Sequence, residues 1–150
     1  KIDGARAQIR QIRLINTEGS ICSQFSCDDP VKIEILFQVN HRIRGLYCCL
    51  FITHMDGTII MMSDSIDTQP DPLSDLSIGL HTISIDIPPR TLAHGEYLIN
   101  LQFSEPGMRI PLASVDQGCS FSLEDFSTIR GNKRPGYFSL ALNWKVDMVS

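Results

Sequence analysis

The chain has 150 residues and a mass of 16.8 kDa, the size of one ordinary domain. Its composition, 43% hydrophobic and 20% charged, is close to that of globular proteins and excludes a disordered chain. No apolar stretch approaches the roughly 18 residues that a membrane-spanning helix needs. The formal net charge of −4 argues against a general nucleic-acid binder, whose binding face is normally basic.

The start of the chain and its cysteines indicate its context. The sequence does not begin with methionine and has no charged-then-apolar leader, so we expect residues 1–150 to be one domain cut from a longer protein. Five cysteines without an N-x-Ser/Thr sequon favour reduced, buried, cytosolic thiols, because an oxidising compartment would leave one thiol unpaired. A zinc site of Cys22 and Cys27 with His41 or His54 is the alternative, although no second close pair completes four ligands.

The dominant pattern is alternation of apolar and polar residues, which is typical of half-buried strands. Residues 5–16 fit neither pure alternation nor a helix. One extra residue between Ile9 and Ile12, a β-bulge, would reconcile this segment with a strand. The segment 31–40 alternates without interruption and is predicted to be a strand.

The middle of the chain predicts a hairpin. Residues 46–54 are apolar on both faces, as expected for a central strand. Asp56–Gly57 then predicts a tight turn into a strand over 58–63. Residues 64–79 have room for one helical turn, and the alternating segment 80–88 is the next predicted strand.

The last third of the chain alternates again over 95–104 and over 136–144. Between these two segments, residues 104–118 are rich in turn-forming residues and are predicted to be a loop. Eight or nine short strands with almost no helical pattern predict an all-β fold, an antiparallel β-sandwich.

Sequence motifs that carry catalysis are absent. The chain has no GxxxxGK[ST], GxGxxG, HExxH or GxSxG sequence. Asp67 and Asp71 have a spacing only loosely like that of a calcium loop, and they lack its glycine and terminal glutamate. Glu124 and Asp125 are neighbours on a strand, so they would face opposite sides and not flank one glycosidic bond. We therefore expect no catalytic residue, metal or cofactor, and a glycan-processing enzyme is a rival hypothesis.

A candidate binding surface follows from the alternation over 46–54. If every second residue faces the core, Tyr47 and Phe51 face outward. Should the strand over 95–104 lie beside it, Asn100 and Gln102 share that face. Aromatic rings cover the apolar C–H faces of sugars and amides bond their hydroxyls, so this set predicts glycan binding. The alternative is that another sheet, loop or subunit covers both rings.

Basic residues precede two of the predicted strands. Arg42 and Arg44 come before the strand over 46–54, and Arg130, Lys133 and Arg134 come before the last one. Arginine matches carboxylates and phosphates, which makes an anionic ligand group one interpretation. Ordinary solvated loop charge is the other interpretation.

Three segments of the sequence carry a family resemblance: VKIEILFQVNHRIRGLYCCLFITHMDGTIIMMSDS, GLHTISIDIPPRTLAHGEYLINLQF and RPGYFSLALNWKV. Their distinctive parts are a strand running into His54–Thr58, then Ile87–Pro88 followed by Leu92, Gly95 and Tyr97, and a closing Pro135–Phe138. Together they resemble the C-terminal domain family of Wzt, the ATP-binding subunit of the ABC transporter that exports O-antigen polysaccharide in Gram-negative bacteria.

The resemblance implies an immunoglobulin-like β-sandwich that binds the exported glycan without catalysis, often at a modified non-reducing end. It also implies the cytoplasmic side of the inner membrane, with an ATPase domain and a membrane subunit as partners in the full-length protein. A homodimer is expected, with exchange of a terminal strand over 136–146, and nucleic acid is not expected as a partner. A dimerisation or docking module is the rival function. The candidate glycan-binding residues are Tyr47, Phe51, Asn100, Gln102, Arg42 and Arg44.

Overall fold

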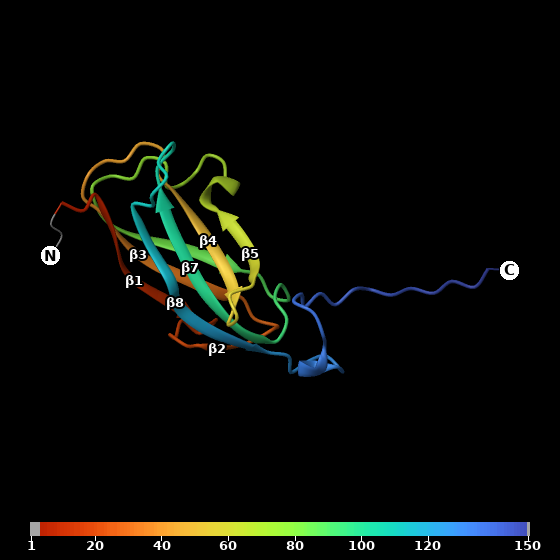
Figure 1. Ribbon diagram of the computed structural model, residues 1–150. Coiled ribbons are helices and arrows are strands. Elements are labelled where there is room, and N and C mark those ends of the chain that lie inside the picture. Colours follow the sequence, from red (N-terminus) through yellow and green to blue (C-terminus); the bar gives the residue numbers. More distant parts are fainter. Residues whose placement is uncertain (1–3, 150) are drawn as a thin grey trace.

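The computed structural model describes residues 4–149, which form eight strands and two short 3-10 turns (Figure 1). The strands are β1 (Ala7–Ile15), β2 (Gln24–Ser26), β3 (Val31–Val39), β4 (Tyr47–His54), β5 (Ile59–Asp64), β6 (Gly79–Ile87), β7 (Gly95–Ser104) and β8 (Ala113–Glu124). The 3-10 turns are η1 (Ser65–Asp67) and η2 (Gly131–Lys133). No helix among the residues described is long and apolar enough to span a membrane.

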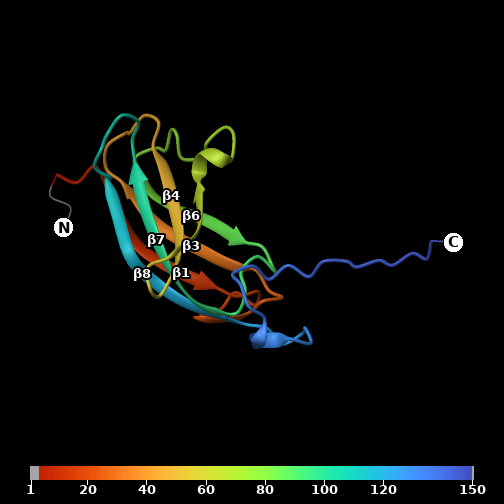
Figure 2. The ribbon, with the colours of Figure 1, turned by 45° about the vertical axis from the view of Figure 1, so that its right-hand side comes forward.

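The strands form two sheets that pack face to face (Figure 2). One sheet has the order β1-β3-β6, and the other has the order β2-β8-β7-β4-β5. Neighbouring strands are antiparallel except for the short β2, which pairs with β8 in parallel. The predicted all-β sandwich is therefore confirmed.

The alternation predicted for β3 builds one half of the core. Its inward side chains, from Val31 to Val39, are at most 1% exposed. Phe37 stacks on Phe103 of the opposite sheet, with ring centroids 4.0 Å apart. Large stacked rings of this kind contribute apolar burial and fix how the sheets face each other. The predicted bulge in β1 is also confirmed, because its register to β3 shifts between Ile9 and Gln11.

The hairpin predicted at Asp56–Gly57 joins β4 to β5. Gly57 has a φ of 89°, in the left-handed region that glycine adopts without steric cost. The Asp56 carboxylate accepts a hydrogen bond from the backbone N–H of Thr58 at 2.9 Å. This local bond closes the turn and sets the register of the two strands.

The prediction of a loop over 104–118 is wrong at its C-terminal end. Strand β8 begins at Ala113 and pairs with β7. The β7–β8 register shifts between Ile99 and Leu101, and Gln117 has a φ of 55°. This irregularity breaks the alternation by which a strand is recognised in a sequence, so its polar residues resemble a turn.

The predicted strand over 136–144 joins neither sheet among the residues described. Backbone hydrogen bonds fasten Tyr137 and Ser139 to residues 91–93, and Ser139 is 1% exposed. Beyond it, residues 140–149, here called the C-terminal arm, extend away from the sandwich (Figure 1). The apolar side chains of the arm are between 60% and 97% exposed: Leu140, Leu142, Trp144, Val146, Met148 and Val149.

All five cysteines are free thiols. Cys27 and Cys48 are buried, and the other three are half-buried. Cys27 and Cys48 belong to the hydrophobic core and Cys22 and Cys119 pack against it as small apolar side chains, whereas Cys49 lies on the outer side of β4.

Candidate functional site

The outer face of the five-stranded sheet carries the predicted aromatic residues. Alternate residues of β4 are buried in the core, so Tyr47 and Phe51 lie on the opposite, outer side. The register places Phe51 opposite Asn100 and Cys49 opposite Gln102. Two rings and two amides predicted from sequence are therefore brought together on one face, and each is half-buried.

The amides of Asn100 and Gln102 are used differently. Asn100 Oδ1 accepts a hydrogen bond from the backbone N–H of Gln117 at 2.7 Å, and its Nδ2 donates to Thr53 Oγ1 at 3.3 Å. Because Gln117 lies in the irregular part of β8, Asn100 helps to hold the shape of this face. The Gln102 amide forms no hydrogen bond with the residues described, so it is free to bond a ligand.

Arg42 and Arg44 lie in the connection that leads into β4. Arg42 forms a two-pronged ion pair with Asp75, with both N–O distances at 3.0 Å. This guanidinium lowers the pKa of the Asp75 carboxyl, although both side chains are about two-thirds exposed. Arg42 and Asp75 line an open pocket of about 530 Å³, and Arg44 and Ser74 line it with them. Arg44 has no ion pair within the described part of the chain, so the uncompensated charge here belongs to it.

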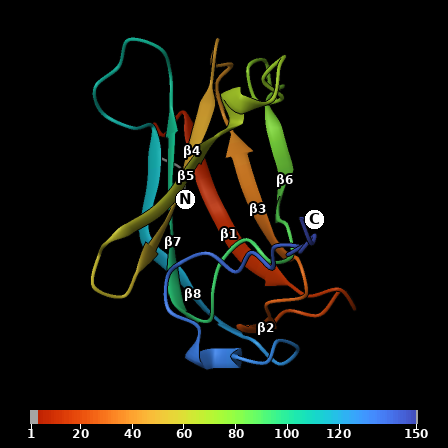
Figure 3. The ribbon, with the colours of Figure 1, turned by 90° about the vertical axis from the view of Figure 1, so that its right-hand side faces the viewer.

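Two connections project from the same side of the five-stranded sheet (Figure 3). One is the turn between β4 and β5, where Met55 is 54% exposed. The other is the loop between β7 and β8, where Met108 and Ile110 are 56% and 79% exposed. The face with Tyr47 and Phe51 therefore lies between two loops that carry exposed apolar side chains.

A polar pocket of about 180 Å³ opens at the β2 end of the same sheet, and sequence reasoning missed it. We call it the hydroxyl pocket; its lining includes Ser23, Gln24, Met55, Glu96, Ser120 and Ser122. The register places Ser122 between Gln24 of β2 and Glu96 of β7. The alternation of Ser120 and Ser122 with Phe121 and Leu123 was the available signal in the sequence. The other wall of the pocket comes from β2, which is distant in the sequence.

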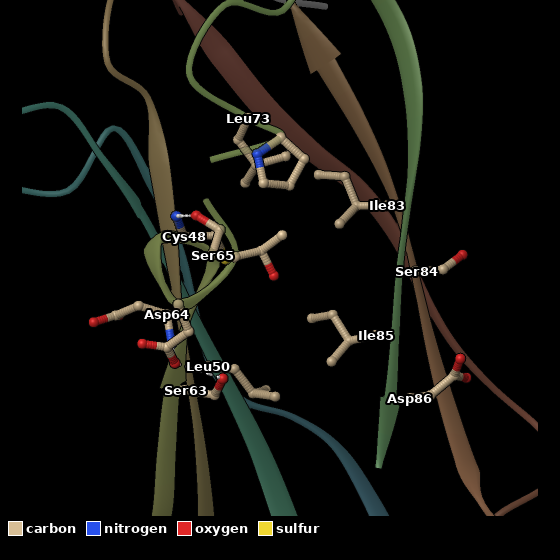
Figure 4. Close-up of a pocket in the computed structure, with 13 residues that line it drawn as sticks. Cys48, Leu50, Ser63, Asp64, Ser65, Leu73, Ile83, Ser84, Ile85 and Asp86 are labelled. Carbon is tan, nitrogen blue, oxygen red and sulfur yellow. Dashed lines mark hydrogen bonds between the residues drawn. The ribbon is translucent and has the colours of Figure 1, made fainter. Parts of the chain in front are cut away.

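A third pocket, of about 290 Å³, lies between the edge strands of the two sheets, and we call it the edge pocket. Cys48 and Leu50 lie on one side of it and Ile83 and Ile85 on the other, with Leu73 near one end (Figure 4). Serine and aspartate side chains of η1, β5 and β6 surround this apolar interior. The half-buried Ile83 and Ile85 show that the core is incompletely covered at the β6 edge.

A buried ion pair anchors the segment before the C-terminal arm. Arg90 donates two hydrogen bonds to the Asp125 carboxylate, both at 3.0 Å, and one to Ser139 Oγ at 3.0 Å. The Asp125 side chain is 2% exposed and also accepts hydrogen bonds from Ser127 and Thr128. The Arg90 guanidinium is the largest cause that holds the pKa of Asp125 well below its usual range. We call this set the Arg90 clamp.

The carboxylates and possible metal ligands of the described residues are dispersed. No three His, Cys, Asp or Glu side chains within residues 4–149 are arranged to hold a metal ion. Glu124 is exposed whereas its neighbour Asp125 is buried in the Arg90 clamp, so the two carboxylates do not face a common space.

The comparisons with known proteins agree with this fold. The family model described as the Wzt C-terminal domain matches residues 4–140. A crystal structure of the C-terminal domain of Wzt has a TM-score of 0.75 and 13% identity, over 95% of this chain and 85% of that one. A β-glucuronidase from glycoside hydrolase family 2 has a TM-score of 0.51 and 10% identity, over 80% of this chain and 13% of that one, which is a likeness of fold alone. No curated protein sequence matches the chain. The chain belongs to the Wzt C-terminal domain family, whose members are non-catalytic carbohydrate-binding domains of O-antigen transporters.

Proposed function

We propose that the domain binds O-antigen polysaccharide on the outer face of the five-stranded sheet, without catalysing a reaction on it. The part that it binds is the modified non-reducing terminus, and binding confers substrate specificity on an ABC exporter. The observation that carries this proposal is the placement of Phe51 beside Asn100 and of Gln102 on the same face. Rings and planar amides side by side suit the C–H faces and the hydroxyls of sugars.

The charges beside this face extend the proposal to the terminal modification. The charge of Arg42 is balanced by Asp75. Arg44, near the end of the sheet where Tyr47 begins β4, has no ion-paired carboxylate among the residues described. Arg44 then pairs with an anionic cap on the glycan, and Arg42 orients the connection. Because sugars are well solvated, affinity in the micromolar range or weaker is expected, about −8 kcal/mol at most.

The test is calorimetric titration of the domain with finished O polysaccharide from the strain that encodes it. Phe51→Ala and Gln102→Ala should each weaken binding several-fold, up to about tenfold, because each removes one contact. The matched controls are Phe126→Ala, at an exposed ring outside the sheets, and Gln11→Ala on β1 of the other sheet. No binding by the unaltered domain would refute the proposal, and unchanged affinity in both test variants would move the site elsewhere.

Membership of the family supports a wider context for this binding. We propose that the domain is a peripheral part of the transporter on the cytoplasmic side of the inner membrane. Its partners there are the ATPase domain of the same full-length protein and the membrane subunit of the transporter. Nucleic acid is not proposed as a partner, because the net charge is −4.

The C-terminal arm supports a second proposal, that two copies of the chain form a homodimer by exchanging it. Exposed apolar side chains in a row, such as Leu142 and Trp144, mark an interaction surface. Among the strands described, β6 has β3 as its one neighbour, so its other edge is open to strand addition. An arm laid along β6 would bring apolar side chains to Ile83 and Ile85 at the edge pocket.

Light scattering with and without glycan tests the dimer. The intact domain should be dimeric without sugar, and deletion of residues 140–150 should leave a folded monomer. Trp144→Asp should weaken the dimer, whereas Ile129→Asp, at an equally exposed residue outside the arm, should not. A dimer that survives the deletion would refute arm exchange. If the domain dimerises yet binds no polysaccharide, the rival function of a docking module is favoured.

A further inference from the structure

We propose that the hydroxyl pocket is a sugar subsite that takes a neutral hexose unit through two adjacent hydroxyl groups. This inference rests on the proposed glycan-binding function and adds a second contact region to it. Three adjacent strands contribute to the pocket at one level: Gln24 of β2 pairs with Ser122 of β8, which pairs with Glu96 of β7. Neighbouring strands lie about 4.8 Å apart, so the three polar side chains form a short row across the sheet.

The polar groups of this row are not used by the protein itself. The side chains of Gln24, Glu96, Ser120 and Ser122 form no hydrogen bond with the residues described. Glu96 and Ser120 are exposed, so water bonds these groups in the free domain. Sugar hydroxyls both donate and accept hydrogen bonds, and they replace such waters without leaving a polar group unpaired.

Glu96 determines which class of sugar fits. Its carboxylate can only accept hydrogen bonds, and its two oxygens can each take one hydroxyl of an adjacent pair. Among the residues described, it is the one charged side chain that lines the pocket, so a uronic acid or a phosphorylated sugar would be repelled. The flexible thioether of Met55, 54% exposed at the side of the pocket, supplies an apolar surface for the C–H face of the ring.

The position of the pocket gives the bound glycan a direction. Arg44 precedes the first residue of β4, and Met55 directly follows the last. The eight residues of β4 span about 26 Å, long enough for several sugar units along the outer face. An anionic end therefore lies at Arg44, and a neutral unit further along the chain lies at Glu96.

The experiment titrates finished O polysaccharide of the encoding strain into three forms of the full domain. These are the unaltered domain, Glu96→Ala, and the double variant Ser120→Ala with Ser122→Ala. Loss of hydrogen bonds to a charged group should weaken binding by about tenfold or more in Glu96→Ala. Glu18→Ala in an exposed turn and Ser77→Ala in the exposed connection before β6 are the matched controls, and both should bind like the unaltered domain.

The specificity is tested separately with short oligosaccharides by amide chemical-shift mapping. Neutral hexose tetramers should shift the amide signals of β2 and of residues 120–122, and oligogalacturonate should not. Glu96→Gln should admit oligogalacturonate more readily, because the repulsion is removed while the shape is kept. If polysaccharide binds with equal affinity to Glu96→Ala and the unaltered domain, the subsite is refuted and the proposed function stands. If polysaccharide binds to no form, both are refuted.

Discussion

Strand β7 and the C-terminal arm share one sequence pattern but occupy opposite environments. In β7 the inward side chains Tyr97, Ile99, Leu101 and Phe103 are completely buried. In the arm, Leu142 and Trp144 alternate in the same way but are 70% and 91% exposed. The comparison shows that alternation encodes a strand with one apolar face, and that the pattern does not specify whether the covering sheet belongs to the same chain.

The same substitution in both regions tests this contrast most strongly. Leu101→Ala should lower the free energy of unfolding by about 2–5 kcal/mol, because it leaves a cavity in a closed core. Leu142→Ala should change it by less than about 0.5 kcal/mol in dilute, monomeric protein, because the side chain has little to lose there. Urea unfolding of both variants measures the difference. A comparable loss in Leu142→Ala at the lowest concentrations would show that its own sandwich covers the arm.

The Arg90 clamp marks the boundary between these two regions, and its removal is the next largest effect. Arg90→Met should cost about 3 kcal/mol, because it leaves the Asp125 carboxylate buried without its partner. Arg42→Met removes a similar two-pronged pair with Asp75 that is exposed to solvent, so it should destabilise the fold far less than Arg90→Met. Thermal unfolding of the two variants compares them. Equal losses would mean that burial of the Arg90 pair contributes nothing.

Sequence reasoning succeeded where one strand determines its own pattern. The alternation of β3, the hairpin at Asp56–Gly57 and the outward direction of Tyr47 and Phe51 depend on residues close together in the chain. It failed at β8, because the irregular backbone at Gln117 breaks the alternation there.

The remaining features depend on contacts between distant segments. Glu96 and Gln24 are far apart in the sequence, and they come together only because both pair with Ser122 of β8. The Arg90 clamp likewise joins Asp125 to Ser139 across separate turns. No short sequence pattern indicates such partners, because the residues around an arginine in a turn do not show whether it is solvated or paired with a distant carboxylate. The sequence predicts which site residues share one face of the sheet. It does not predict which of them already form hydrogen bonds within the protein, as Asn100 does.

The pH dependence of stability sharpens the role of the clamp. The pKa of Asp125 is lowered in the folded protein, so the clamp contributes its full stability above the ordinary aspartate pKa of about 3.9. This contribution is lost progressively as the pH falls below that value toward the folded pKa. Urea unfolding from about pH 7 to pH 3 should therefore show a shallower fall in Arg90→Met than in the unaltered domain. Arg42→Met should change the slope much less, because solvent and salt screen its exposed pair with Asp75.

The smallest expected effect is on the reactivity of the Cys48 and Cys49 thiols. It shows whether the domain itself or the arm of a second chain buries these thiols. Burial raises the pKa of Cys48 to about 12, and burial together with Asp64 does the same for Cys49. At pH 8 a thiol of that pKa is ionised in about one molecule in ten thousand, and only the thiolate reacts with iodoacetamide. Mass spectrometry of the native domain should find both residues unlabelled, and both should be labelled in urea.

The same labelling in a variant without residues 140–150 completes the comparison. Cys48 lines the edge pocket, yet it is 4% exposed in the single chain. Its protection should therefore persist when the arm is deleted. Rapid labelling of Cys48 in the deletion variant would show instead that the sandwich closes over this side only when a second chain supplies the missing strand. In that case the sandwich without the arm would be incompletely folded, and the arm would belong to the core as much as β7 does.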